Sequence, residues 1–173
     1  MLDIYRQHIQ QGIGDLGEYE AEPLRAEDLK QRRKNMRKRR LPHLVADLDG
    51  VVAGYAYVVP FRKRPAYRYA LKHSIYVHGD FRRAGIGRQL LPALIDACAQ
   101  ADYLQMIGYI DSTNAASLRL HEACGFQQVG LLKSVGFKYG QWTDSVMVQR
   151  SLGQGDNAAM MPCSLRTGAD TGC

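Results

Sequence analysis

One turn of the chain combines arginine and glycine in a way that could bind phosphate. Arg82-x-x-Gly85-x-Gly87 follows a strand-like run and precedes an amphipathic helix with apolar residues at 90, 91, 94, 95 and 98. The unpaired N–H groups and positive dipole end of a helix N-terminus attract anions, and glycines let the backbone approach a ligand closely. Neither a P-loop lysine nor the third glycine of a dinucleotide motif is present. On this turn alone, a phosphate cradle and a tight turn without a ligand are equally good interpretations.

A second segment, residues 114–126, reads Asn-Ala-Ala-Ser-Leu-Arg-Leu-His-Glu-Ala-Cys-Gly-Phe. Together the two segments resemble the GCN5-related N-acetyltransferase superfamily, in which Arg/Gln-x-x-Gly-x-Gly binds the coenzyme A pyrophosphate and Asn-x-x-Ser with a later Gly-Phe marks the next helix. Residues 61–69, 73–77 and 135–144 are similar to the phosphinothricin and methionine sulfoximine N-acetyltransferase branch. The resemblance covers about residues 2–152.

The resemblance implies an α/β (α+β) fold with a central mixed, mostly antiparallel sheet flanked by helices. It also implies an enzyme that moves an acetyl group from acetyl-CoA to the primary amine of a small amino-acid-like substrate. In this superfamily the amine attacks the thioester directly within a ternary complex. No metal is expected.

The resemblance assigns most cofactor contacts to the two segments and the strand before them. Backbone groups of the strand should pair with the pantetheine arm, and the Val77 N–H is expected to polarise the thioester carbonyl. Asn114 should bond the arm, with Ser117 in support. The expected cofactor-binding residues are Ile75, Tyr76, Val77, Arg82, Arg83, Ala84, Gly85, Ile86, Gly87, Arg88, Asn114 and Ser117.

Three residues are catalytic candidates. The resemblance places His121 where many superfamily members have the tyrosine that protonates the thiolate, and a histidine pKa near 6.5 suits proton exchange; the alternative is a half-buried helix histidine with a satisfied ring. Where family members carry a glutamate base, this chain has Lys72. Lys72 could be neutral through desolvation, His73 or His121 could act through water, or activity could be reduced or redirected. His121 with water is the preferred base, and Lys72 could instead hold an anionic group of the substrate.

A basic, aromatic loop supplies the acceptor-binding candidates Arg62, Arg64, Tyr67 and Arg68. A guanidinium binds a carboxylate through two parallel hydrogen bonds, whereas the ordinary alternative is a solvated loop. Residues 136–144 resemble the family's strand-connecting loop, which often reaches the neighbouring subunit's site. A homodimer is therefore expected.

The elements that must position these residues follow from periodicity and turn residues. Apolar spacing predicts helices at 2–13, 23–40, 90–98 and 114–124, and strands at 44–48, 51–59, 73–77, 103–110, 128–135 and 142–150. Asp49-Gly50 predicts a hairpin. One domain is expected over 1–152, followed by a disordered tail over 153–173. The chain opens at a helix, so either the family's first strand is missing and a sheet edge is uncovered, or the recorded start is too late.

Composition limits the rival functions. The net charge is +6 in 173 residues, and seven of the bases lie in residues 32–40. A nucleic-acid-binding helix is one interpretation of that run and a solvated helix face is the preferred one. A second rival, motivated by Lys72, is a catalytically impaired acyl-CoA-binding protein.

The chain has no run of about 18 apolar residues, no signal-peptide core, and four cysteines without metal-ligand spacing. These features predict a cytoplasmic protein without a membrane or metal partner.

Overall fold

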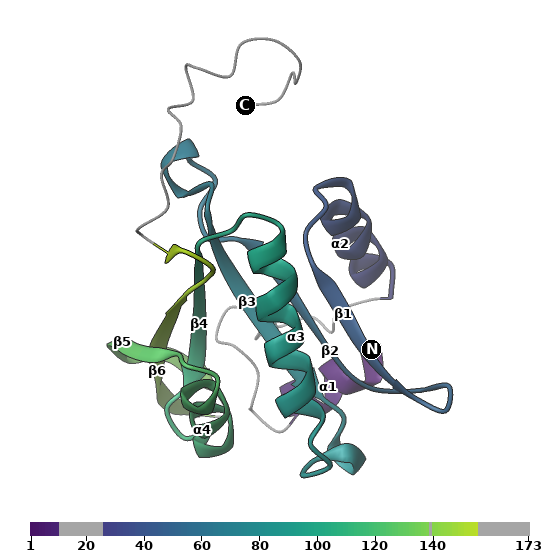
Figure 1. The fold of residues 1–173 in the computed structure, drawn as a ribbon. Helices are drawn as coiled ribbons and strands as arrows, with labels where there is room; N and C mark the ends of the chain where they lie inside the picture. The colour runs from purple at the N-terminus through teal and green to yellow at the C-terminus, as the bar shows by residue number, and fades with distance from the viewer. Residues whose placement is uncertain (11–25, 139, 156–173) are drawn as a thin grey trace.

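The described residues, 1–10, 26–138 and 140–155 of the computed structural model, form a six-stranded sheet with helices on both faces (Figure 1). The strand order is β1-β2-β3-β4-β6-β5, and neighbours are antiparallel except for the parallel pair β3 and β4. The strands are β1 (His43–Leu48), β2 (Val51–Pro60), β3 (Ala70–Val77), β4 (Gln105–Asp111), β5 (Gln127–Lys138) and β6 (Gln141–Ser151). The helices are α1 (Leu2–Gln10), α2 (Ala26–Lys38), α3 (Ile86–Gln100) and α4 (Ala115–Ala123), with short 3-10 turns η2 (Pro65–Tyr67) and η3 (Gly79–Phe81).

This architecture confirms the predicted fold class and each predicted helix and strand, with shifted ends. The strand expected to begin at residue 73 begins at Ala70, because the backbone of Lys72 continues the ladder although its side chain is polar. The helix expected over 23–40 ends at Lys38. Residues 11–13, 23–25 and 156–173 of the predicted first helix, second helix and tail lie outside the described residues.

The predicted hairpin joins β1 and β2 through Asp49-Gly50. Both residues adopt positive φ, 53° and 84°, which is the backbone that a tight two-residue hairpin turn requires. The Asp47 carboxylate accepts a hydrogen bond from the Gly50 N–H at 2.8 Å and so holds the turn.

Two apolar layers position the site, one on each face of the sheet. On one face α3 buries Leu91 and Leu94 completely against the sheet, and its helical conformation continues through Pro92. Burying each leucine contributes about 1.5–3 kcal/mol. On the other face, Ile4 of α1 packs with Tyr55 of β2 and Tyr76 of β3. The sheet is therefore a fixed middle layer, and alternate residues of each strand face different helices.

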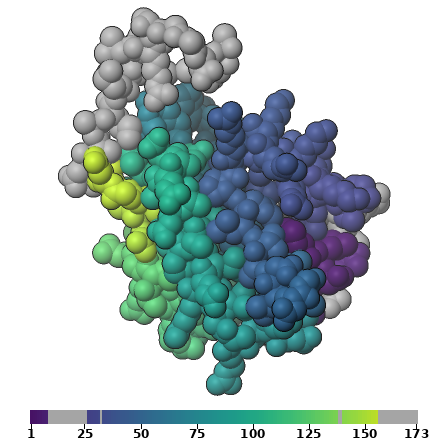
Figure 2. Space-filling view, turned by 45° about the vertical axis from the view of Figure 1, so that its right-hand side comes forward, coloured from purple at the N-terminus to yellow at the C-terminus, as the bar shows by residue number. Residues whose placement is uncertain are grey.

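The edges and surface of the described chain leave two features uncovered. No described strand pairs with the outer edge of β1, and Val45 in that strand is exposed. Helix α2, in blue, lies at one side of the molecule, away from the green β5–β6 hairpin (Figure 2). Cys98 is a free thiol in the core, and burial raises its pKa to about 12, so it is an inert core residue. None of the described helices has the length and apolarity needed to cross a membrane.

Candidate active site

The site begins where β3 and β4 stop pairing. Their parallel register runs only from Ala70 to Lys72, whereas the pairing of β3 with β2 continues to Val77. In that antiparallel register the His78 N–H donates to the Ala53 carbonyl at 2.9 Å. Even-numbered residues of β3 thus turn their backbone groups towards β2, and the odd-numbered Ile75 and Val77 turn theirs towards β4. Beyond Lys72 this edge of β3 has no described pairing with β4, so a ligand can use it.

Tyr76 differs from its two neighbours in this respect. Its backbone groups face β2, and its ring stacks on Tyr55 with centroids 4.9 Å apart. Its expected role in cofactor binding stays a prediction.

One hydrogen-bonding group on the open edge of β3 is already occupied. His8 of α1 donates its Nε2–H to the Val77 carbonyl at 2.9 Å, and burial lowers the pKa of His8, which favours the neutral ring. The Val77 N–H remains on the open edge. Sequence reasoning missed His8, since α1 carries no recognised motif and its histidine contacts a residue 69 positions away.

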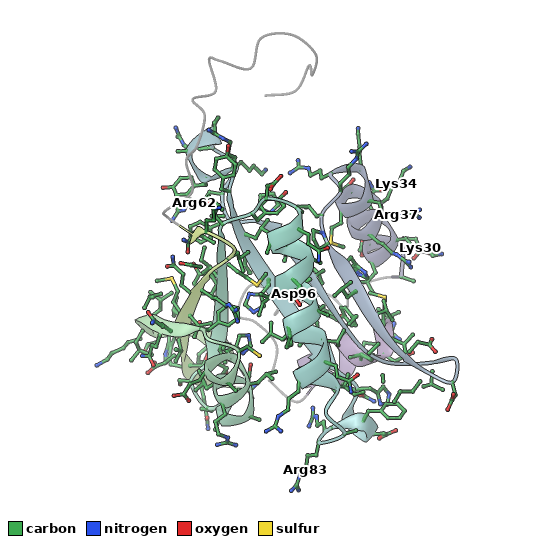
Figure 3. All side chains as sticks on the ribbon, in the orientation of Figure 1. Lys30, Lys34, Arg37, Arg62, Arg83 and Asp96 are labelled. Atoms are coloured by element: carbon green, nitrogen blue, oxygen red, sulfur yellow. The ribbon has the colours of Figure 1, made fainter. Side chains whose placement is uncertain are left out.

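The arginine-glycine turn lies at the N-terminus of α3, beyond the open end of β3. Arg83 and Gly85 both have positive φ, 67° and 82°, and Gly85 is the N-cap of the helix. Because the first N–H groups of a helix have no acceptor within it, this turn offers donors to an anion. The side chains of Arg82, Arg83 and Arg88 are exposed, and Arg83 points away from the sheet (Figure 3).

Gly85 and Gly87 of the turn are needed for different structural reasons. A β-carbon at Gly85 would meet no atom within 4 Å, so only its positive φ requires glycine. A β-carbon at Gly87 would lie 3.0 Å from the Leu120 side chain, so Gly87 lets α3 pack closely on α4. The structure thus explains Gly87 by helix packing, without a ligand. For the rest of the turn, both phosphate binding and a tight turn without a ligand stay as interpretations.

Asn114 caps α4. Its Oδ1 accepts a hydrogen bond from the Ser117 N–H at 3.1 Å, which is the usual way an asparagine stabilises a helix start. The amide NH₂ of Asn114 still offers two donors. Ser117 contributes its carbonyl oxygen, which accepts from His121 Nδ1–H at 2.7 Å.

Two buried histidines meet beside the point where β3 and β4 separate. His121 of α4 is 2% exposed and His73 of β3 is 4% exposed. Their Nε2 atoms are 2.8 Å apart. His73 also donates its Nδ1–H to the Ile107 carbonyl of β4 at 2.9 Å, and Phe126 packs against both rings. The structure therefore brings two of the three catalytic candidates together.

Burial is the main electrostatic influence on the pair. It lowers the pKa of His121, against the opposing effect of the Ser117 carbonyl. Burial, together with the charges of His121 and Lys72, lowers the pKa of His73 to about 3. The pair therefore does not hold two protons near neutral pH.

Lys72 lies on the opposite face of the sheet from the histidines, because successive strand residues alternate. Its ammonium is 5.6 Å from the centroid of the Tyr109 ring on β4. The histidines share a face with α3 and α4, whose N-termini carry the arginine turn and Asn114. If the cofactor is held by those N-termini, as expected, it approaches from the histidine side, and the acceptor is then expected on the Lys72 side.

The acceptor-loop candidates lie in the β2–β3 connection, at the other end of the sheet from Arg83 (Figure 3). The Arg62 guanidinium stacks over Phe61 and Tyr67, at 5.3 and 5.5 Å from the ring centroids. Arg68 lies over Tyr69 and bonds the Pro65 carbonyl. Arg64 is exposed. Contact of Arg62, Arg64, Tyr67 and Arg68 with an acceptor remains a prediction.

Sequence reasoning also missed Gly108 of β4. A β-carbon there would lie 2.6 Å from Cε1 of His73 and 3.1 Å from Val148, so only glycine leaves room for the imidazole. The available signal was a glycine inside a strand, which often marks a close approach. No group of three potential metal ligands occurs among the described residues.

Comparison with known proteins supplies independent information. A sequence model described as "Acetyltransferase (GNAT) family" matches residues 6–126. A phosphinothricin N-acetyltransferase of Alcaligenes faecalis is 44% identical over 154 residues, which are 88% of this chain and 77% of that protein. An L-methionine sulfoximine/L-methionine sulfone acetyltransferase of Salmonella typhimurium is 40% identical over 111 residues, 64% of this chain and 65% of that protein.

Solved structures show the same likeness. A phosphinothricin acetyltransferase from Sinorhizobium meliloti, in complex with AcCoA, has a TM-score of 0.87 at 36% identity and covers 94% of this chain and 86% of its own. A ribosomal-protein-alanine N-acetyltransferase from Brucella melitensis has a TM-score of 0.82 at 34% identity, with 87% and 91% covered. The relatives therefore agree on the kind of reaction and differ in the acceptor they are named for.

Proposed function

The chain belongs to the acetyltransferase (GNAT) family and is an acetyl-CoA-dependent N-acetyltransferase, and from this premise we propose that its acceptor is the primary amine of a small amino-acid-like molecule. The acceptor class is that of phosphinothricin and methionine sulfoximine, for which the similar proteins of A. faecalis and S. typhimurium are named. The resemblance inferred from the sequence is confirmed at the level of the family. The observation that carries the proposal is the open edge of β3, which lies between the arginine turn and the buried histidines.

The described residues fit acetyl-CoA. The left-handed turn at Arg83 and Gly85 and the first N–H groups of α3 suit the pyrophosphate. The open backbone of Ile75 and Val77 suits the amides of the pantetheine arm. Acetyl-CoA supplies the thioester whose acyl carbon the amine attacks.

The chain's own groups then have separate tasks. The Val77 N–H donates to the carbonyl oxygen of the thioester as negative charge develops there, and one such donor in a dry site lowers the barrier by about 3–4 kcal/mol. His121 gives a proton to the departing sulfur. The amine must arrive without its extra proton, and a cation such as Lys72 on the acceptor side favours that neutral form.

Lys72 is also compatible with the proposed acceptor class. An ammonium on the acceptor side attracts the carboxylate or phosphinate of an amino-acid-like molecule, whereas a simple amine offers it nothing. Lys72 thus acts as an anion-binding group in place of a general base. A chain that binds acetyl-CoA but does not turn over is the competing function, and the same residue motivates it.

The β5–β6 hairpin supports the proposal of a homodimer. Trp142 is 66% exposed, and its ring lies 5.2 Å from that of the exposed Phe137. Large exposed apolar side chains on adjacent strands mark an interaction surface, and a second copy of the chain is the proposed occupant. Light scattering of the purified protein should give twice the chain mass, and a monomer at micromolar concentration would reject the dimer. The cytoplasmic location stays a prediction.

The test is release of free thiol from acetyl-CoA by the full chain with a panel of amines. The panel contains phosphinothricin, L-methionine sulfoximine, L-methionine sulfone, a simple amine and a peptide with N-terminal alanine. Thiol release should be fastest with an amino-acid-like acceptor. Coenzyme binding in a thermal-shift assay without turnover on any amine would support the competing binder, and neither binding nor turnover would reject the enzyme.

A further inference from the structure

We propose that His73 and His121 hold a single proton between their Nε2 atoms, so that the pair is one buried positive charge and one acid. That the proton then goes to the departing sulfur rests on the proposed function. The sharing itself rests on the geometry of the two rings.

The outer nitrogens of the pair fix both tautomers. His73 Nδ1 lies 2.9 Å from the Ile107 carbonyl, and His121 Nδ1 lies 2.7 Å from the Ser117 carbonyl, which is much closer than the Ser117 hydroxyl at 3.4 Å. A carbonyl oxygen only accepts, so each Nδ1 carries a hydrogen. In a neutral imidazole the other nitrogen is then bare. Two neutral rings would therefore point two lone pairs at each other.

The inner nitrogens are too close for that arrangement. The 2.8 Å between the two Nε2 atoms is a hydrogen-bond distance, and one proton between them turns a repulsion into a charge-assisted bond. A second proton is excluded, since the pKa of His73 is lowered by burial and by the charge of His121. With one proton shared between the two rings, each of the four ring nitrogens has a hydrogen-bond partner.

The described residues that pack around the two rings are apolar or glycine, so no carboxylate among them balances the shared positive charge. β4 presents Gly108, β6 presents Val148 behind it, and Phe126 covers both rings. The charged group that acts on His73 from its own strand is Lys72, which opposes further positive charge. Burial lowers the pKa of both rings even with the two carbonyl acceptors in place, so the short Nε2–Nε2 bond is the interaction that must offset the cost of holding the shared proton.

The chemistry balances as an acid step. As the amine nitrogen forms its bond to the acyl carbon, the carbon–sulfur bond breaks and its electron pair goes to sulfur. The sulfur takes the shared proton from His121, and the amine's surplus proton leaves to water. The two rings are then neutral with facing lone pairs, and this repulsion draws a proton back from solvent. His121 is the catalytic residue, and His73 is a positioning residue that sets its proton affinity.

The direct test is nitrogen-15 NMR of the full chain with labelled histidine, without substrate. The proposal expects both Nδ1 atoms to be protonated and one proton to be shared by the two Nε2 atoms between pH 6 and 8. Gly108→Ala should abolish the signature by displacing His73, whereas Gly130→Ala should keep it, since a β-carbon there meets only the Met147 side chain, whose terminal methyl is the nearest atom at 3.2 Å. A neutral ring with a bare Nδ1 would overturn the proposal.

Enzyme kinetics provide a second test of the shared proton. His73→Asn and His121→Asn should each lower kcat at least thirtyfold and shift or remove the alkaline limb of the pH–rate profile, where the pair would lose its shared proton. The double variant should cost no more than the worse single one, because the rings act as a unit. A profile unchanged by His73→Asn, or additive losses, would contradict the shared proton. If no amine is acetylated, the proposed function fails and the NMR result alone decides the sharing.

Discussion

Lys72 and His73 are neighbours in β3 that face opposite sides of the sheet. His73 meets His121 of α4 on one side, and Lys72 lies over the Tyr109 ring on the other. Under the proposed function, this division gives the site a thiol side, where the histidine pair would hold a proton, and an amine side, where Lys72 would attract the acceptor. On this proposal, a lysine in place of the family's glutamate is compatible with acetyl transfer.

Replacing Lys72 tests the amine side. Lys72→Met should raise KM for phosphinothricin or methionine sulfoximine tenfold to a hundredfold, since a hydrogen bond to a charged group contributes about 1.5–3 kcal/mol. Affinity for coenzyme A should not change. Lys133→Met, at an exposed position of β5, is the matched control. A KM that stays the same while kcat falls would instead assign Lys72 to the chemistry.

Gly85→Ala separates backbone strain from ligand binding. Its positive φ should cost about 1 kcal/mol of stability, and the distorted turn should weaken coenzyme A binding tenfold or more. Gly50→Ala carries the same strain, with φ of 84° and no atom within 4 Å, but lies in the β1–β2 hairpin. Calorimetry should show coenzyme A affinity lost only in the first variant. Equal affinities would remove the turn from the cofactor site.

Gly87→Ala tests the packing role of the second glycine. The added methyl should press on Leu120 and cost about 1–3 kcal/mol in thermal unfolding. Leu120→Ala in the same chain should recover part of that loss together with coenzyme A binding. Binding that stays lost in a refolded double variant would show that Gly87 is needed for ligand approach.

The basic face of α2 should be dispensable for acetyl transfer. Lys30, Lys34 and Arg37 lie together on that helix, well away from Arg83 (Figure 3). Replacing the three by glutamine should change kcat/KM less than twofold. Filter binding of RNA and DNA to the parent chain across salt concentrations should be weak and flat. Tight, steeply salt-dependent binding that the substitutions abolish would revive the nucleic-acid interpretation.

Acid should destabilise the chain through His8. Because burial lowers its pKa in the folded state, the unfolded chain binds more protons, so this contribution is complete above about pH 6.5 and is lost as pH falls towards the folded value. His8→Gln keeps a donor for the Val77 carbonyl but cannot titrate. Urea unfolding of the variant should show a smaller loss between pH 7 and 5. Identical slopes would contradict a neutral, buried His8.

The sequence could reveal what local patterns encode. Asp49-Gly50 predicts the β1–β2 hairpin, and the arginine-glycine turn marks the start of α3, whereas the opposite faces of Lys72 and His73 became visible only when the structure extended β3 back to Ala70. The histidine pair could not be foreseen, because its members are 48 residues apart and meet only when α4 docks on β3. The same holds for His8, which reaches β3 through the packing of α1. The sequence shows that Gly108 is an unusual residue for a strand, but it does not show that the His73 ring packs against it.

Competition between acceptors tests the central claim most directly. The full chain is given limiting acetyl-CoA with equal concentrations of L-methionine sulfoximine and a peptide with N-terminal alanine, and both acetylated products are quantified by mass spectrometry. The ratio of products is the ratio of kcat/KM values, and we expect it to favour the small amino acid at least tenfold. A ratio that favours the peptide, or no acetylated product of either kind, would contradict an enzyme for small amino-acid-like amines.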